Sequence, residues 1–182
     1  MTPRIPPLPK EGRDPRTVEI LDGLGGSFGR ELNIFATLAH HPKLLKRWSA
    51  FGGTLLYGGR LAERDRELLI LRAGYLCGAH YEWGQHVLIG RAAGLTDAEI
   101  ARIAAGPDAD GWSPEDASLL RAVDELHADS RIGDATWEQL AARLDEQQLI
   151  EVCMVVGQYH LVAFTLNSLG VEPEPGLPEM PA

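Results

Sequence analysis

Residues 73–94 of this 182-residue chain gather titratable side chains in a stretch that otherwise has the pattern of a helix. Glu82 and His86 are four residues apart, so a helix stacks them on one face. Cys77 and His80 are three residues apart, on a face that overlaps the first. A carboxylate beside an imidazole in an apolar setting can exchange protons near neutral pH, because burial raises the pKa of a carboxyl group and an ion pair raises that of a histidine. The spacing therefore predicts an acid–base site.

A third proton-carrying group, Glu67, lies 19 residues before His86. Gly74 and Gly78 stand between them, and glycines favour a kink or break in a helix. Such a break would fold the segment that carries Glu67 back toward the Glu82–His86 pair. We expect the three side chains to lie together.

The elements that must position these residues are helices. Helix signals recur from residue 14 onward, and no segment shows four or more clean apolar–polar alternations bounded by turn residues. The sequence therefore predicts an all-α fold, with helices over residues 16–24, 32–40, 42–57 and 146–169. Three further residues have the type and spacing of helix N-caps, namely Thr96, Ser113 and Asp145.

Both ends of the chain are proline-rich. We expect an N-terminal arm over residues 1–13, a helical domain over 14–170 and a C-terminal tail over 171–182. The arm and tail are expected to lie outside the helical bundle, where such segments often clasp a neighbouring subunit. The last helix is apolar all round, which predicts burial on most of its faces in a bundle core or a subunit interface.

Composition excludes several classes of partner. The formal charge is −9, with scattered Lys and Arg, so the concentrated basic surface that nucleic acid requires is missing. The most apolar run, residues 149–164, is interrupted by Glu151, Gln158 and His160, which argues against a membrane span. The N-terminus lacks the apolar stretch of a secretory signal, and the two cysteines are far apart, so we expect a cytoplasmic protein with reduced thiols.

Two segments together resemble one known family. They are "RDRELLILRAGYLCGAHYEWGQHVLIGRAAGLTDAEI" and "VGQYHLVAFTLNSLGVEPEPG", and the chain resembles the carboxymuconolactone decarboxylase family, which also contains thioredoxin-independent alkylhydroperoxidases, over roughly residues 30–176. The resemblance implies an alkylhydroperoxidase-like helical bundle with a helical hairpin at its core. It also implies a homo-oligomer, with a trimer or hexamer favoured and sites at or near the subunit contacts.

The resemblance also bears on the chemistry. In the peroxidase branch a glutamate is followed at +12 and +15 by a Cys-x-x-Cys pair and at +19 by a relay histidine. Counted from Glu67, these positions hold Ala79, Glu82 and His86, so the redox pair is absent. The decarboxylase branch, which the chain then resembles, uses glutamate and histidine without a metal or organic cofactor. On this basis His86 is the expected proton donor, Glu82 orients and charges it, and Glu67 tunes it or relays the proton.

Five other residues are candidates for substrate binding: Cys77, His80, Trp83, Tyr159 and His160. Some of these residues could have a structural role instead of binding substrate. Trp83 also fits core packing, and only one of the adjacent Tyr159 and His160 is expected to face inward. Arg64, Arg66 and Arg72 could hold a substrate carboxylate or form surface ion pairs with Asp65, Glu63 or Glu67. Glu82 and His86 could form an exposed surface pair or, with His80, ligate a metal.

The sequence thus favours a cofactor-independent lyase or isomerase that moves protons on a small carboxylated metabolite, with a lactone or ring-derived compound as the expected substrate. The alternative is an alkylhydroperoxidase-like thiol peroxidase that uses Cys77. A third reading is a non-catalytic binding protein that keeps the fold and its pocket.

Overall fold

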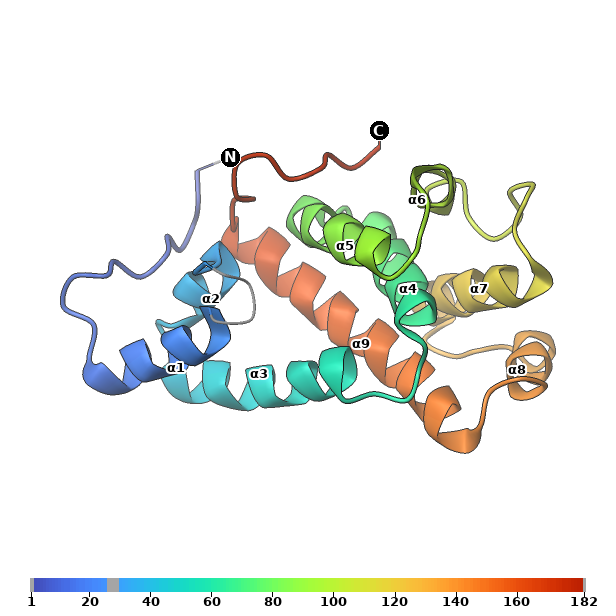
Figure 1. Ribbon diagram of the computed structural model, residues 1–182, viewed down its shortest axis with the longest axis horizontal. Helices are drawn as coiled ribbons and strands as arrows, with labels where there is room; N and C mark the ends of the chain where they lie inside the picture. The colour runs from blue at the N-terminus through green and yellow to red at the C-terminus, as the bar shows by residue number, and fades with distance from the viewer. Residues whose placement is uncertain (1, 26–29, 182) are drawn as a thin grey trace.

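The computed structural model describes residues 2–25 and 30–181, and within these ranges the chain is all-α, as the sequence predicted. The described residues form nine helices and no strand. The helices are α1 (Pro15–Gly25), α2 (Asn33–Leu38), α3 (Pro42–Tyr57), α4 (Glu63–Leu76), α5 (His80–Ala92), α6 (Asp97–Ile103), α7 (Pro114–Asp129), α8 (Asp134–Ala141) and α9 (Glu146–Leu169). Figure 1 shows α9 crossing the molecule diagonally, with α4 and α5 on one side of it and α3 on the other.

The three predicted N-caps are confirmed. The side chain of Thr96 accepts from the backbone N–H of Glu99, and Ser113 and Asp145 act in the same way at the starts of α7 and α9. Each cap pairs an N–H group that the first turn of a helix leaves without a partner. The bounds of α3 and α9 match the predicted ranges. Helix α2 is shorter than predicted at both ends.

Helices α4 and α5 form the hairpin at the centre of the fold. The chain reverses at Gly78, whose φ of 58° lies in the left-handed region that glycine adopts without steric cost. Helix α4 packs against α5, α7 and α9, and the run Leu68–Leu71 at its middle is fully buried. The predicted break is thus real, and it turns α5 back along α4.

The N-terminal helices form a second, smaller hydrophobic cluster. Leu21 of α1, Phe35 of α2 and Leu45 of α3 pack together with Tyr81 of α5 and Leu166 of α9. The larger cluster is built around α4, α7 and the first half of α9. The two clusters meet along α5 and α9, which therefore carry the residues that face both.

The arm and the tail run along the outside of the helices and are hydrogen-bonded to helices of their own chain (Figure 1). The N–H of Leu8 donates to the carbonyl of Ala36, and that of Arg4 to the carbonyl of Leu169. In the tail, the buried carboxylate of Glu174 accepts from the hydroxyl of Tyr81 at 2.9 Å and from the backbone N–H of Asn33 at 2.7 Å. The carboxylate of Glu174 therefore anchors the tail to α5 and to the start of α2. The proline content of the tail did not predict this anchoring.

Helix α9 is the one helix among the described residues that is long and apolar enough to cross a membrane. Half of its most apolar window is buried inside this chain, and its length and composition alone do not distinguish a membrane span from a core helix. The other half leaves Ile150, Leu161 and Phe164 exposed, so burial on most faces is not reached within the single chain.

Candidate active site

The central hairpin brings together the three residues that the spacing singled out. Glu67 comes from the first half of α4, and Glu82 and His86 come from the first two turns of α5. His86 Nδ1 lies 2.6 Å from Glu67 Oε2, and His86 Nε2 lies 2.9 Å from Glu82 Oε1. Both ring nitrogens of the imidazole therefore contact a carboxylate.

This carboxylate–imidazole–carboxylate relay, Glu67–His86–Glu82, is almost completely buried. Glu67 is 0% exposed, and Glu82 and His86 are 5% exposed. The buried Arg66 donates from Nε to Glu67 Oε1 at 3.0 Å, so the inner carboxylate has two partners. The ring of Tyr159 packs edge-on against His86 with centroids 4.9 Å apart. An exposed surface pair, one of the alternatives at the level of sequence, is thus excluded.

The charge of His86 follows from these contacts. Burial alone would lower its pKa, but the charges of Glu67 and Glu82 and the hydrogen bonds to them outweigh burial and raise the pKa to about 10. His86 is then an imidazolium at neutral pH, held between two acceptors. Burial and the same two carboxylates raise the pKa of Tyr159 well above its usual value, so its hydroxyl stays protonated.

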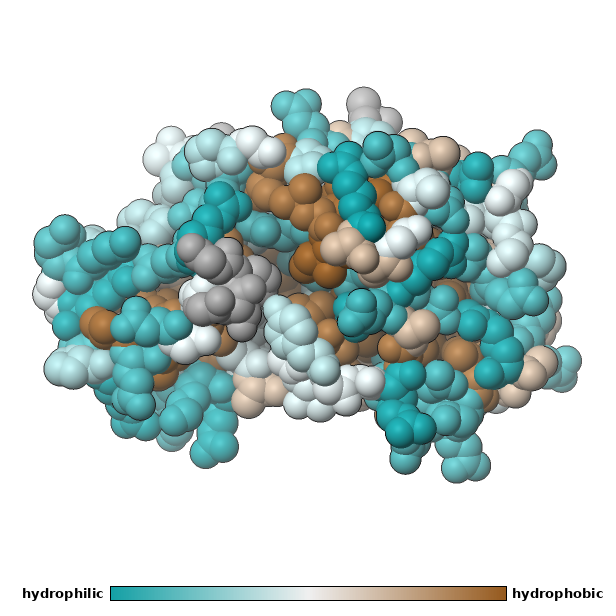
Figure 2. Space-filling view, in the orientation of Figure 1, coloured by the Kyte–Doolittle hydropathy of each residue, from teal (hydrophilic) through white to brown (hydrophobic). Residues whose placement is uncertain are grey.

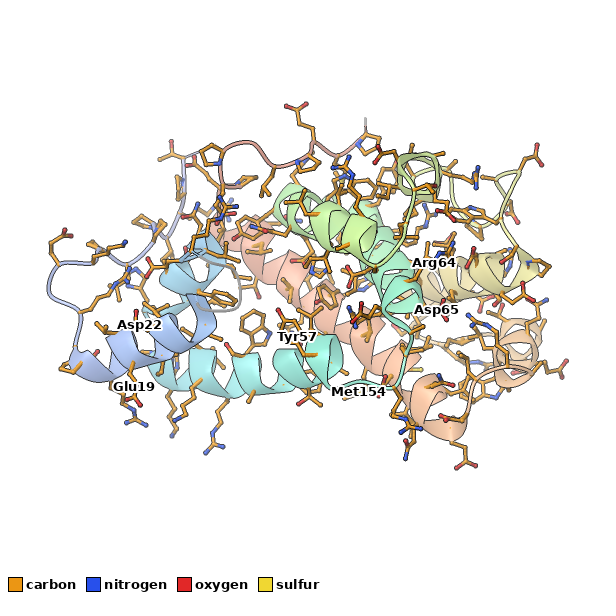
Figure 3. All side chains as sticks on the ribbon, viewed as in Figure 1. Glu19, Asp22, Tyr57, Arg64, Asp65 and Met154 are labelled. Carbon is orange, nitrogen blue, oxygen red and sulfur yellow. The ribbon has the colours of Figure 1, made fainter. Side chains whose placement is uncertain are left out.

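The relay opens on a cavity of about 140 Å³ between α3, α5 and α9. Glu82, His86 and Tyr159 line it, whereas Glu67 lies behind His86. Most of the remaining wall is apolar, with Ile34, Phe35, Leu56, Ile89 and Val162 among its residues. Tyr57, labelled in Figure 3 near the end of α3, closes the wall on that side.

The cavity wall also holds two polar residues that sequence reasoning missed as candidates for ligand contact. Trp48 Nε1 and Ser49 Oγ are buried, and they have no hydrogen-bond partner among the described residues. Both residues line the cavity. A buried donor without a partner costs free energy, so such groups in a pocket wall indicate contacts that a ligand completes. They lie on α3, far in sequence from the hairpin, and no local pattern marks them.

The other predicted substrate-binding residues lie elsewhere. Tyr159 lines the cavity, but Cys77, His80, Trp83 and His160 do not. Trp83 is 1% exposed within the hydrophobic core, on another face of α5, and His80 is exposed at the start of that helix. Successive residues of a helix point about 100° apart, so Trp83 and His160 face away from the cavity, whereas Tyr81 and Gln158, on the other side of Glu82 and Tyr159, line it.

The three candidate arginines are held by acids of this chain. Arg64 pairs with Asp116 and Glu99, Arg66 with Glu67, and Arg72 with Asp124. All three arginines are thus in ion pairs and none lines the cavity, but only Glu67 is among the expected partners, and its pair with Arg66 is buried and not on the surface. The metal reading of the relay also lacks support, because His80 is exposed and both nitrogens of His86 are already engaged by carboxylates.

Comparison with known proteins agrees with the resemblance seen in the sequence. The model of the carboxymuconolactone decarboxylase family matches residues 42–125, which include α3, α4, α5 and most of α7. Together with the shared fold described next, this match supports the carboxymuconolactone decarboxylase family for this chain. No curated protein sequence matches the chain significantly.

Solved structures share the fold at low sequence identity. An uncharacterized peroxidase-related protein from Ralstonia eutropha JMP134, described as an alkylhydroperoxidase AhpD core, is 19% identical with a TM-score of 0.81, over 94% of this chain and 93% of that one. A peroxidase-related protein from Silicibacter sp. TM1040 is 15% identical with a TM-score of 0.82, over 97% and 96%. The debrominase Bmp8, as a cysteine-to-alanine variant in complex with 2,3,4-tribromopyrrole, is 13% identical with a TM-score of 0.77, over 94% and 91%. These likenesses establish the alkylhydroperoxidase-like fold.

Proposed function

We propose that this protein is a cofactor-independent lyase or isomerase that transfers protons on a small, carboxylated, ring-derived metabolite, with decarboxylation of a lactone acid as the favoured reaction. The observation that carries the proposal is the buried relay of Glu67, His86 and Glu82 at the wall of a mostly apolar cavity. Low polarity around paired titratable groups strengthens their electrostatic effect on a bound substrate. The match to the family model gives the reaction class its name.

The geometry suggests a division of roles that differs from the one expected from sequence. Both nitrogens of His86 are occupied, so Glu82, which lines the cavity, is the group best placed to contact substrate. In this proposal Glu82 takes the Nε2 proton of the His86 imidazolium and passes it to the substrate carbon, and His86 then regains a proton from solvent. Glu67 holds Nδ1 and keeps the imidazole in position, and the buried Arg66 fixes Glu67 in turn.

The reaction balances with these groups alone. The bond between the ring carbon and the carboxylate breaks, CO₂ leaves, and the electron pair enters a conjugated carbonyl as an enolate. Trp48 Nε1 and Ser49 Oγ are unpaired donors in the wall, suited to bind the enolate oxygen or a remaining carboxylate. The enolate collapses when its carbon takes one proton from Glu82. The net change is loss of CO₂ and uptake of one proton from solvent through His86.

The size and character of the cavity limit the substrate to a small ring. A cavity near 140 Å³ offers room for a molecule of about the size of benzene with few substituents. A structural neighbour, the debrominase Bmp8, binds 2,3,4-tribromopyrrole, which is also a small flat ring. The cavity volume and this complex together support a small ring as the ligand of the cavity.

A thiol peroxidase that uses Cys77 has less support from the geometry. Cys77 is half-buried at the end of α4 and does not line the cavity, and burial raises the pKa of its thiol. A raised pKa lowers the fraction of thiolate, which is the nucleophile in peroxide reduction. Cys153 is exposed on α9, and neither cysteine is in a disulfide.

The test follows carboxymuconolactone in D₂O by NMR, with CO₂ release and deuterium incorporation at carbon as readouts. We expect turnover by the natural chain and a loss of at least about 100-fold in Glu82→Gln, the size of a lost acid–base group. Glu138→Gln, an exposed glutamate on α8, is the matched control and should keep full activity. Unchanged rates in Glu82→Gln, or neither CO₂ release nor exchange with the natural chain, would contradict the proposal.

A further inference from the structure

A second cluster of reactive side chains lies outside the cavity, where three helices meet. Cys77 follows the last residue of α4, His127 lies in the last turn of α7, and His160 lies in the middle of α9. One ligand atom from each of them lies within 4.8 Å of the other two. Cys77 and His160 are half-buried and His127 is exposed, so the cluster is open to solvent on one side.

Hydrogen bonds fix the orientation of His160. Its Nδ1 lies 2.8 Å from the carbonyl oxygen of Val156, and a carbonyl only accepts, so Nδ1 carries a hydrogen. In the neutral ring the lone pair is then on Nε2, which faces His127 Nδ1 at 2.9 Å. A histidine whose second nitrogen is anchored by a backbone carbonyl has the arrangement common among metal-bound histidines.

The helices that carry the three residues form a rigid frame. Helix α4 packs against both α7 and α9, and α7 packs against α9. The residue that ends α4 is held as well, because Asn167 Nδ2 donates to the carbonyl oxygen of Cys77 at 2.8 Å. The frame places the two imidazoles, which lie within α7 and α9, beside the thiol of Cys77, which caps the end of α4.

We propose that Cys77, His127 and His160 form a binding site for a thiophilic transition-metal ion of the zinc class, with the fourth coordination position open to solvent. Thiolate sulfur and imidazole nitrogen are the ligands that zinc prefers in proteins, and three protein ligands with one open position are typical of zinc sites that accept an exogenous ligand. Tetrahedral zinc would need separations between ligand atoms of about 3.3 to 3.6 Å. Starting from separations of up to 4.8 Å, the ligand atoms need to approach one another by about 1.2 Å at most.

This site is independent of the proposed acid–base chemistry, since none of its residues lines the cavity. A bound ion would cross-link α4, α7 and α9 at one end of the central hairpin. The competing explanation is a plain hydrogen bond between two neutral histidines, in which His127 Nδ1–H donates to His160 Nε2. That arrangement uses no metal and predicts no affinity for one.

The test is a titration of the reduced full-length chain with Co²⁺, whose thiolate complexes absorb strongly in the near ultraviolet, followed by displacement with Zn²⁺. We expect one ion per chain and a sulfur-to-cobalt band. Cys77→Ser should abolish the band, and His160→Ala should weaken binding by at least about 100-fold, since even partners outside the coordination shell contribute 10–100-fold. Cys153→Ser and His80→Ala are the matched controls, because both residues are exposed and lie outside the cluster.

Three results would contradict the metal site. A band that persists in Cys77→Ser, or that is lost in Cys153→Ser, would overturn the site, as would the absence of a band in the natural chain. Because a serine at position 77 is nearly isosteric, a folding defect is not expected, and circular dichroism verifies this for every variant. A Zn²⁺-dependent rise in melting temperature that occurs in Cys153→Ser but not in Cys77→Ser gives a second readout.

Discussion

At the scale of single residues, the charge of His86 determines what the cavity can do. An isolated buried imidazole would be neutral, because burial disfavours its charged form. Here Glu67 and Glu82 lie 2.6 Å and 2.9 Å from its two nitrogens, and their negative charges reverse that preference. The pKa of His86 is therefore raised to about 10, and the relay holds a transferable proton at neutral pH.

The sign of the pH dependence follows from this shift. A histidine with a raised pKa in the folded state stays charged through the neutral range and loses its proton only as the pH approaches the folded value. A neutral imidazole in the same place would instead titrate near its ordinary pKa of about 6.5 or below. The two states of His86 are therefore distinguishable between pH 7 and pH 10, in the folded protein and without any substrate.

At the scale of elements, close packing of the tail on α5 makes Gly84 a sensitive position. A Cβ on Gly84 would lie 2.9 Å from Cβ of Leu177 and 3.1 Å from the carbonyl oxygen of Pro178. We expect Gly84→Ala to displace the tail and to lower the free energy of unfolding by about 1–3 kcal/mol, as over-packing generally does. Urea unfolding and hydrogen exchange of residues 171–181 measure both effects.

The control for this variant is Gly23→Ala. Gly23 is exposed on α1, and a Cβ there would meet nothing within 4 Å. Alanine has the higher helix propensity, so this change should be neutral or stabilise by up to about 1 kcal/mol. A tail that stays protected in Gly84→Ala, with unchanged stability, would show that the tail is not packed on α5 as described.

The sequence predicted the elements well where the relevant physics is local. The caps at Thr96, Ser113 and Asp145 and the break near Gly78 depend on neighbouring residues, and all are confirmed. Helical spacing also predicted the pairing of Glu82 with His86. Spacing alone does not place Glu67 beside His86. Glu67 reaches His86 because the break at Gly78 turns α5 back along α4.

The remainder of the site depends on long-range packing, which spacing alone does not encode. Trp48 and Ser49 reach the cavity because α3 packs against α9, and Glu174 is buried because the tail folds over α5. Cys77 and His160, expected in the substrate pocket, meet His127 instead. The position of each of these residues depends on which face of its helix or tail segment packs against which neighbour. Only the tertiary structure gives that information.

At the scale of the whole molecule, α9 presents an apolar stripe. Its exposed members are Ile150, Met154, Leu161 and Phe164, whose spacings of four, seven and three residues keep them on one face. Met154 is labelled in Figure 3, and Figure 2 shows further hydrophobic side chains at the surface over α5 and α9. A helix that is apolar on every face but buried on only half of them indicates a further partner.

We expect that partner to be a second copy of this chain, in the trimer or hexamer that the family resemblance implies. Light scattering after gel filtration should give a multiple of the 19.9 kDa chain mass. The double variant Ile150→Asp with Leu161→Asp should reduce the mass to that of one chain, because it places charges in the stripe. Val18→Asp, at an exposed apolar position on α1, is the control. A monomeric natural chain, or an unchanged mass in the double variant, would contradict this expectation.

The most direct test of the central claim is an NMR titration of His86 in the folded protein with nitrogen-15 in its histidines, assigned with the His86→Gln variant. The account predicts that Nδ1 and Nε2 both carry hydrogen at pH 7, and that the ring loses its proton only near pH 10. In Glu67→Gln, which removes one of the two charges, the transition should move to lower pH. A neutral His86 at pH 7, with a transition near the ordinary value of about 6.5, would contradict the proton relay on which the proposed function depends.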